Sequence, residues 1–254
     1  MIRLQNVYKY YPTKRGLHYV LHDASLEIPT GVNVAVVGRN GAGKSTLMRL
    51  LAGVDLPNSG HISTTYRMSW PLGLAGGISK TMTGRESTLF VCRIMGTPPA
   101  EIPEKLRFVE EFTELGKYFE MPVHTYSSGM RSRLKFATSM IFDFDCYIID
   151  ELTAVGDESF KEKARSLFRE KRDSANFIKV THNTQEVREE CDAVIMLERG
   201  KLYYFDDVDE GLDTYRAVIR GERQRQDRKR QRRAAGESLP VRSRGGGRQS
   251  AGMR

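Results

Sequence analysis

The segment GRNGAGKS, from Gly38 to Ser45, constrains the fold of this chain more than any other feature. It fits the pattern G-x-x-x-x-G-K-[ST], in which glycines let successive backbone N–H groups turn inward onto phosphate oxygens. The short apolar run NVAVV precedes the segment, and KSTLMRLLAG follows it with the apolar spacing of a helix. The sequence therefore predicts a phosphate-binding loop between a buried strand and a helix.

Each residue type in this loop suits one part of a triphosphate. Lys44 supplies a point charge between the outer phosphates, and the hydroxyl of Ser45 is a suitable ligand for Mg²⁺. The alternative is a glycine turn with an incidental lysine, which does not explain the strand and helix that flank the loop. The residues expected to bind the nucleotide here are Gly38, Asn40, Gly41, Gly43, Lys44, Ser45 and Thr46.

The run CYIIDE supplies the acidic residues that hydrolysis of a nucleotide requires. Asp150 ends a buried-strand pattern, where its carboxylate is expected to hold Mg²⁺ through water. Glu151 follows directly and is expected to orient or deprotonate the attacking water. An apolar run that ends in Asp-Glu is common by itself, and the alternative for Glu151 is a surface carboxylate. Downstream of a phosphate loop, the pair indicates a nucleoside triphosphatase.

His182 lies in the segment VTHN, directly after a third short apolar run, FIKV (177–180). A lone histidine is usually structural. Its place after a buried strand, in a chain with a phosphate loop, favours a contact with the γ-phosphate from the edge of the sheet. We therefore expect His182 to be catalytic.

Strand and helix patterns alternate over much of the chain, which indicates an α/β fold with a layered sheet. AVIML (193–197) is a fourth buried-strand pattern, and LYYF (202–205) is predicted to pair with it as a hairpin. Residues 2–6 and 19–28 are expected to form an antiparallel β portion. Residues from about 70 to 140 are mostly helical in pattern, which predicts a helical subdomain inserted between two halves of the core.

The net charge of +8 comes from one end of the chain. Residues 221–254 hold 11 Lys and Arg against 3 Asp and Glu, whereas residues 1–220 hold 29 of each sign. The end segment has almost no large apolar residues, so we expect a globular domain over 1–220 and a basic disordered tail over 221–254, apart from a helical start. The tail is either solvated or a binding segment for anionic lipid or an acidic partner. Nucleic acid is not the expected partner, because no aromatic residue interleaves the arginines.

Composition argues against several other classes of protein. The three cysteines, Cys92, Cys146 and Cys191, have no paired spacing, so packed thiols are expected rather than a metal site or disulfides. No stretch approaches the ~18 apolar residues of a membrane-spanning helix. The N-terminal segment lacks the apolar centre of a signal peptide, so we expect a cytosolic protein unless a partner holds it elsewhere.

Taken together, GRNGAGKST, CYIIDE and VTHN resemble the ATP-binding subunit of an ABC transporter. The resemblance implies a P-loop NTPase fold of the ABC type and the cofactors ATP and Mg²⁺. It also implies roles for two further positions. Asp157, in LTAVGD, falls where the family's dimer-contacting aspartate lies, and Tyr11, in KYYP, matches the aromatic residue that stacks on adenine, with Tyr10 as a nearby alternative.

The segment YSSGMRSRLKF begins with small residues that open a helix, a place where free N–H groups attract an anion. Simple helix capping by the serines is the alternative. YSSGMR is similar to the ABC signature segment, with Ser127 at the serine position and Gly129 at the second glycine. The resemblance implies that these two residues contact the γ-phosphate of ATP held by a second copy of the chain, so that a complete site needs two chains arranged head to tail.

Several segments narrow the resemblance to exporters of bacterial surface polysaccharides, and most closely of capsular polysaccharide. They are YSSGMRSRLKF, DELTAVGD, SWPLGLAGG and MTGRES. This implies an ATPase that binds an integral membrane permease at the cytoplasmic face of the inner membrane, as a peripheral protein. Exporters of O-antigen and teichoic acid share much of the pattern, and a soluble ABC ATPase acting on ribosomes or DNA is a more distant alternative.

One position departs from the family pattern. ABC subunits normally have a glutamine in the loop that enters the helical subdomain, and no glutamine occurs between Tyr66 and Glu86. Ile78 and Ser79 stand at the corresponding place. The departure leaves open how the γ-phosphate is reported to the membrane partner.

Overall fold

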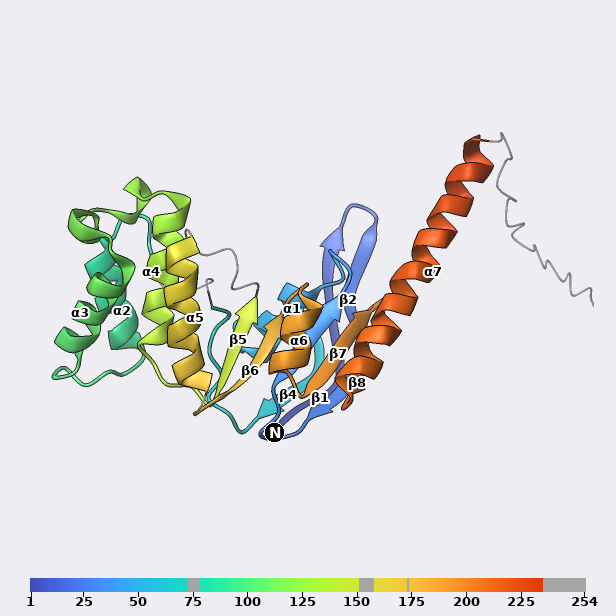
Figure 1. The fold of residues 1–254 in the computed structure, drawn as a ribbon, viewed down its shortest axis with the longest axis horizontal. Coiled ribbons are helices and arrows are strands. Elements are labelled where there is room, and N and C mark those ends of the chain that lie inside the picture. The colour runs from blue at the N-terminus through green and yellow to red at the C-terminus, as the bar shows by residue number, and fades with distance from the viewer. Residues whose placement is uncertain (73–77, 151–157, 173, 235–254) are drawn as a thin grey trace, which may run out of the picture. The chain divides into compact units, whose positions relative to one another are not determined.

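The structure is a computed structural model that describes residues 1–72, 78–150, 158–172 and 174–234. The chain divides into two compact units, Met1–Tyr215 and Arg216–Arg254. The first unit contains two sheets and the helices α1 to α6 (Figure 1).

A five-stranded sheet of order β5-β6-β3-β7-β8 forms the centre of the first unit. Its first four strands are parallel, and all five residues of β3 are buried, as expected for a strand covered on both faces. The last strand, β8, pairs antiparallel with β7, which confirms the predicted hairpin. The strands are β3 (Val34–Gly38), β5 (Cys146–Asp150), β6 (Asn176–Val180), β7 (Ala193–Glu198) and β8 (Lys201–Phe205).

A second sheet, of order β2-β1-β4, is antiparallel. It consists of β1 (Ile2–Thr13), β2 (Gly16–Ile28) and β4 (Ser59–Thr64). The antiparallel portion is therefore confirmed, but its first two strands are longer than expected. They continue to a tight turn at Lys14 and Arg15, because pairing of the two strands extends the hairpin beyond the apolar residues that mark it in the sequence.

Three helices, α2 (Gly84–Ile94), α3 (Ile102–Thr113) and α4 (Ser128–Met140), lie between β4 and β5 in the chain and pack together. Two short 3-10 helices, Gly116–Glu120 and Val123–Thr125, connect α3 to α4. Thr83 caps α2: its hydroxyl accepts a hydrogen bond from Glu86 N–H while the Glu86 side chain accepts one from Thr83 N–H. This reciprocal capping fixes where the helical segment begins.

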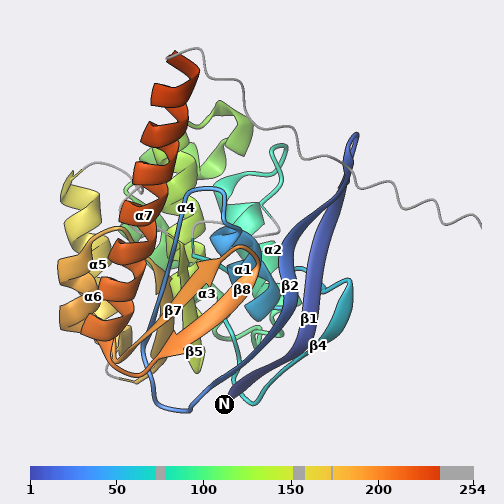
Figure 2. The ribbon, with the colours of Figure 1, turned by 90° about the vertical axis from the view of Figure 1, so that its right-hand side faces the viewer.

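The remaining helices of the first unit cover the five-stranded sheet. They are α1 (Lys44–Leu51), α5 (Glu158–Arg172) and α6 (Thr184–Glu190). Figure 2 shows α1 on the side of the sheet that faces β1 and β2, and α5 and α6 on the opposite side. Leu47, Met48 and Leu50 of α1 are at most 2% exposed and belong to a single core cluster with residues of both sheets. Burial of α1 between the sheets holds the segment before it, residues 39–43, at the edge of the central strand.

The three cysteines are buried thiols that form no disulfide, in agreement with the packed thiols expected from the sequence. Burial raises the pKa of Cys146 to about 12, so its thiol is a packing group in the core cluster. Among the helices that the structure describes, none combines the length and apolar composition needed to cross a bilayer.

The last helix, α7, extends from Val208 to Ala234 and passes the boundary at residue 220 that we expected between domain and tail. The expected disordered tail is therefore helical as far as Ala234. The first part of the tail, residues 221–234, is rich in Arg and Gln, which favour helices even where no apolar face is available to bury. Residues 235–254 lie outside the described residues.

Gly211 and Gly221 of α7 offer a matched test of helix packing. A Cβ on Gly211 would lie 2.7 Å from Val194 Cβ on β7, whereas a Cβ on Gly221 would have none of the described atoms within 4 Å. Gly211→Ala should lower the free energy of unfolding by about 1–3 kcal/mol through overpacking, despite the better helix propensity of alanine. Gly221→Ala should leave it unchanged or raise it by up to about 1 kcal/mol. Urea denaturation measures both, and equal stability of the two variants would contradict the close contact at Gly211.

Candidate functional site

The loop between β3 and α1 can follow its path because glycines occupy two crowded positions. A Cβ on Gly38 would lie 2.7 Å from the carbonyl oxygen of Leu197, at the end of the neighbouring strand. A Cβ on Gly43 would lie 2.1 Å from Val20 Cγ1, and Gly43 also has a φ of 106°. Side chains are thus excluded by the strands on either side of the loop, not only by a ligand.

Lys44 begins α1 and is 9% exposed. Its ammonium donates hydrogen bonds to the carbonyl oxygens of Gly38, at 2.7 Å, and Arg39, at 3.1 Å. The backbone carbonyls of the loop therefore hold the Lys44 ammonium over the loop. A charged phosphate oxygen is a stronger acceptor for an ammonium than a carbonyl oxygen, so a bound phosphate would compete with these carbonyls.

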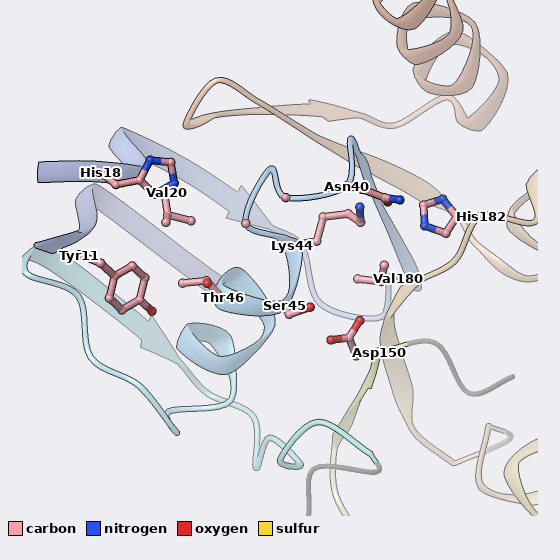
Figure 3. A pocket seen from close by; sticks show the side chains of 12 residues that line it. Tyr11, His18, Val20, Asn40, Lys44, Ser45, Thr46, Asp150, Val180 and His182 are labelled. Atoms are coloured by element: carbon pink, nitrogen blue, oxygen red, sulfur yellow. The ribbon is translucent and has the colours of Figure 1, made fainter. Parts of the chain in front are cut away.

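A cavity of about 670 Å³ opens beside the loop (Figure 3). This volume is within the usual range for small-molecule sites, about 300–1,000 Å³. Of the loop residues expected to bind nucleotide, all except Gly38 line the cavity. The full lining is Tyr11, His18, Val20, Asn40, Gly41, Gly43, Lys44, Ser45, Thr46, Asp150, Val180 and His182.

Asp150 and His182 reach this cavity because their strands are neighbours of β3. Asp150 at the end of β5 is in register with Val180 at the end of β6, and β6 pairs with β3. The carboxyl ends of adjacent parallel strands meet at one edge of a sheet, which is where ligands of open α/β sheets bind. Figure 3 shows the imidazole of His182 on the same side of the cavity as Asn40 and Lys44.

The chemistry of the lining suits Mg²⁺ bound together with phosphate. The hydroxyl of Ser45 and the carboxylate of Asp150 point toward one another in Figure 3. Mg²⁺ prefers hard oxygen ligands, and it usually combines one or two protein oxygens with water and phosphate. Ser45 and Asp150, the two residues that we expected from the sequence to bind Mg²⁺, are therefore the residues that would hold the ion.

Tyr11 lines the far end of the cavity, and a pair of charged residues supports its ring. Its hydroxyl donates to Asp55 Oδ2 at 3.2 Å, and Lys9 Nζ lies 2.7 Å from Asp55 Oδ1 and 5.2 Å from the centre of the Tyr11 ring. Burial raises the pKa of the Asp55 carboxyl, but hydrogen bonds from Lys9, Leu56 N–H and Tyr11 outweigh it and bring the pKa below its ordinary value. Asp55 thus stays ionised and keeps Lys9 and Tyr11 in place.

Sequence reasoning missed His18 and Val20, which also line the cavity. His18 pairs directly with Tyr11 across the β1–β2 hairpin. The turn at Lys14 and Arg15 is the signal that could have identified it, because a two-residue turn after Thr13 pairs position 11 with position 18.

Ser127 and Gly129 lie away from this cavity. Ser127 is the N-cap of α4, and its hydroxyl accepts a hydrogen bond from Met130 N–H at 3.2 Å. Among the residues that the structure describes, none from α4 lines the cavity. Within one chain, Ser127 therefore acts as a helix cap. Neither Ser127 nor Gly129 reaches the phosphate loop of its own chain.

Two expected site residues, Glu151 and Asp157, lie outside the described residues. Of the pair that replaces the usual glutamine, Ser79 has its hydroxyl 2.9 Å from that of Thr81, and neither Ile78 nor Ser79 lines the cavity. The structure thus places the loop residues, Asp150, His182 and Tyr11 together, and places the two signature residues elsewhere.

Comparisons with known proteins agree with this geometry. The family model described as ABC transporter matches residues 21–154. The chain is 51% identical over 217 residues to the polysialic acid transport ATP-binding protein KpsT of Escherichia coli, an alignment that covers 85% of this chain and 96% of that protein. It is 42% identical to the capsule polysaccharide export ATP-binding protein CtrD of Neisseria meningitidis serogroup B, over 86% of this chain and 100% of that protein.

A solved structure has a similar fold. It is the ATP-binding cassette MJ0796, described as dimeric, in a post-hydrolysis state and bound to ADP and Pi. The TM-score is 0.65 at 20% sequence identity, and the match covers 81% of this chain and 98% of that one.

The expected stacking of a tyrosine on the adenine base can be tested by substituting Tyr10 and Tyr11 separately. Tyr11→Ala should weaken ATP binding about 10- to 100-fold, since stacking on a base contributes about 1–3 kcal/mol. Tyr11→Phe keeps the ring and should stay within about threefold. Tyr10 packs on Tyr19 with ring centres 5.2 Å apart and does not line the cavity, so Tyr10→Ala is the matched control. Titration with a fluorescent ATP analogue measures the affinity of all three variants. A larger loss of affinity in Tyr10→Ala than in Tyr11→Ala would show that Tyr10, not Tyr11, contacts the base.

Proposed function

The chain belongs to the ABC transporter ATP-binding family, and on that premise we propose that it hydrolyses ATP to power export of capsular polysaccharide across the bacterial inner membrane. The observation that carries the ATPase activity is the cavity in which the loop, Asp150 and His182 meet at one sheet edge. The names of the two relatives that the chain matches over nearly their whole length support the choice of substrate.

In this proposal, ATP extends along the cavity from Tyr11 to the sheet edge. The adenine stacks on Tyr11, and the backbone N–H groups between Asn40 and Thr46 donate to the phosphates. Lys44 exchanges its loop carbonyls for phosphate oxygens, an exchange that favours the ligand because both partners are charged. Mg²⁺, held by Ser45 and Asp150, would offset charge on the outer phosphates.

Hydrolysis requires the water and the γ-phosphate to be positioned and charge to be stabilised, with little covalent chemistry from the protein. Glu151 directly follows Asp150 and is proposed to orient the attacking water. His182 is proposed to donate a hydrogen bond to the transferring phosphoryl group. Positioning and electrostatics of this kind supply most of the acceleration in phosphoryl transfer.

A second copy of the chain is proposed to complete the site through Ser127 and Gly129. The support is the room around Gly129, where a Cβ would meet only Ser127 Oγ, at 3.9 Å, and would cause no strain. Glycine is a poorer helix former than alanine, and no contact among the described residues requires it at this position. A glycine at position 129 would be explained if another molecule had to approach the backbone closely there. In our proposal, that molecule is the triphosphate bound to a partner chain. Asp157 is proposed to contact the same partner.

The proposed location is the cytoplasmic face of the inner membrane, on an integral permease. The docking surface is proposed to include the segment from Trp70 to Arg85 and the helical subdomain. Trp70 itself is half-buried: its indole N–H donates to Ser139 Oγ at 2.7 Å, and its ring packs edge-to-face on Phe142 and Phe144. Its share of any docking surface is therefore small. The basic segment 221–254 is proposed to add an attraction to anionic lipid.

Mixing two inactive variants tests the shared site. Lys44→Ala removes a charge from the loop, and Gly129→Asp adds a negative charge where the partner's γ-phosphate is proposed to lie. An aspartate in the first turn of α4 is favourable for the helix, so Gly129→Asp should fold normally. Each variant alone should lose ATPase activity, and a mixture should recover part of it, because mixed dimers contain one site with an intact loop and an intact signature. ATPase activity measured across mixing ratios detects the recovery. Full activity of Gly129→Asp alone would contradict the shared site.

Glu151→Gln tests hydrolysis and export together. The amide cannot accept a proton, so turnover should fall about 10²- to 10⁴-fold while ATP affinity is kept and an ATP-bound dimer accumulates. In a capsule-deficient strain that lacks its own ATP-binding subunit, the wild-type chain should restore surface polysaccharide and Glu151→Gln should not. ATPase assays, size-exclusion chromatography with ATP and capsule staining provide the measurements. Export restored by Glu151→Gln would refute the catalytic assignment.

A further inference from the structure

The residues on either side of His182 both donate hydrogen bonds to the carboxylate of Glu186. The Thr181 hydroxyl donates to Glu186 Oε2 at 3.4 Å, and the side-chain amide of Asn183 donates to Glu186 Oε1 at 3.2 Å. The two oxygens of Glu186 therefore hold the residue before His182 and the residue after it.

The two neighbours of His182 are also bonded to each other. The backbone N–H of Asn183 donates to Thr181 Oγ1 at 3.1 Å, across the histidine. Asn183 Oδ1 accepts from Gln185 N–H at 3.0 Å and from Glu186 N–H at 3.4 Å, which starts α6 directly after the segment. These bonds leave the backbone at His182 little freedom to rotate away from the cavity.

Glu186 is itself tied to the sheet through Lys179, a buried residue of β6. Lys179 Nζ lies 3.2 Å from Glu186 Oε2 and 2.6 Å from Glu190 Oε2, and the lysine side chain is 9% exposed. Removing one partner from a buried ion pair is costly because it leaves a charge uncompensated. Lys179 therefore fixes α6, and with it the carboxylate of Glu186, at a set distance from the end of β6.

We infer that Glu186 is a positioning residue for His182: it aims the imidazole at the γ-phosphate by holding Thr181 and Asn183. This inference rests on the proposed function, because it acts through the role assigned to His182. A displacement of about 1 Å in a reacting group can cost about 10²-fold in rate, so a loose histidine would lower turnover without weakening ATP binding. Glu190 is the matched comparison, since it binds the same ammonium from one turn further along α6.

The test compares Glu186→Ala with Glu190→Ala in the full-length chain, using ATPase rates and a separate measurement of ATP affinity. Glu186→Ala should lower kcat about 10- to 100-fold, with the Kd for ATP within about twofold of wild type. Glu190→Ala should keep kcat within about twofold. A loss of the same size in both variants, or an unchanged kcat in Glu186→Ala, would overturn the inference.

A double-mutant cycle with His182 separates positioning from a general loss of structure. His182→Ala should be strongly impaired, and Glu186→Ala combined with His182→Ala should be no slower than His182→Ala alone. If the loss of kcat in the double variant equalled the product of the losses in the two single variants, Glu186 would act independently of His182, and the inference would be overturned. If His182→Ala turns over normally, the role of His182 fails and the inference fails with it. If His182→Ala is impaired and Glu186→Ala is not, only the inference fails.

If Glu186→Ala does not fold, Thr181→Val tests the same positioning of His182. It is nearly isosteric, leaves the Lys179–Glu186–Glu190 contacts in place, and removes the hydroxyl that bonds both Asn183 and Glu186. Its kcat should fall about 3- to 10-fold at unchanged ATP affinity, and Glu186→Gln, which keeps an oxygen acceptor, should retain more activity than Glu186→Ala. A normal kcat in Thr181→Val would overturn the inference.

Discussion

Several negative charges lie within a few ångströms of one another in a triphosphate, and a protein that removes them from water must replace the hydration they lose. In the proposed function, this chain supplies the replacement interactions at one edge of one sheet. The backbone N–H groups of the loop and the ammonium of Lys44 come from the end of β3, while Asp150 comes from the end of β5 and His182 from the end of β6. The arrangement depends on three adjacent parallel strands that end together. The core cluster that packs α1 against both sheets is what keeps the loop at that edge.

The proposed function adds a second requirement, which is that one chain by itself holds only part of the site. Ser127 and Gly129 belong to α4, and α4 belongs to a group of helices that packs within itself through α2 and α3. Arg133 on α4 and Lys163 on α5 both donate to backbone oxygens at the end of α3, those of Thr113 and Phe112. Cations at the C-terminal end of a helix are favourable, so these contacts join α5 to the helical group. The helix α5, which follows the segment that holds the proposed catalytic residue Glu151, is thus in contact with the helices proposed to meet the permease.

Much of the centre of the molecule could be predicted because its signals are local. A continuous apolar run predicts a buried strand, and the spacing of Gly38, Gly43, Lys44 and Ser45 predicts the loop, whatever lies elsewhere in the chain. The length of the helical start of the tail could not be predicted: low apolar content excludes a packed core, but α7 continues to Ala234 because Arg and Gln are good helix formers. The sequence assigned Tyr11 to the base only through the family resemblance and kept Tyr10 as an alternative. The pairing of β1 with β2 shifts by one residue between Lys9 and Tyr10, with the extra residue, Val20, on β2. Such a bulge decides which residues of β2 lie opposite Tyr10 and Tyr11.

The sequence by itself determined the chemistry: a phosphate loop, an Asp-Glu pair after a buried strand, a histidine after another and a signature segment, all of which depend on spacing along the chain. Only the tertiary structure decided which side chains share a space. It brought His18 opposite Tyr11 through hairpin register, held Asp55 behind Tyr11, kept Ser127 away from its own chain's loop and fastened the segment around His182 to Glu186 and Lys179. The reason is physical. These contacts join residues on different elements, and their geometry is set by how those elements pack.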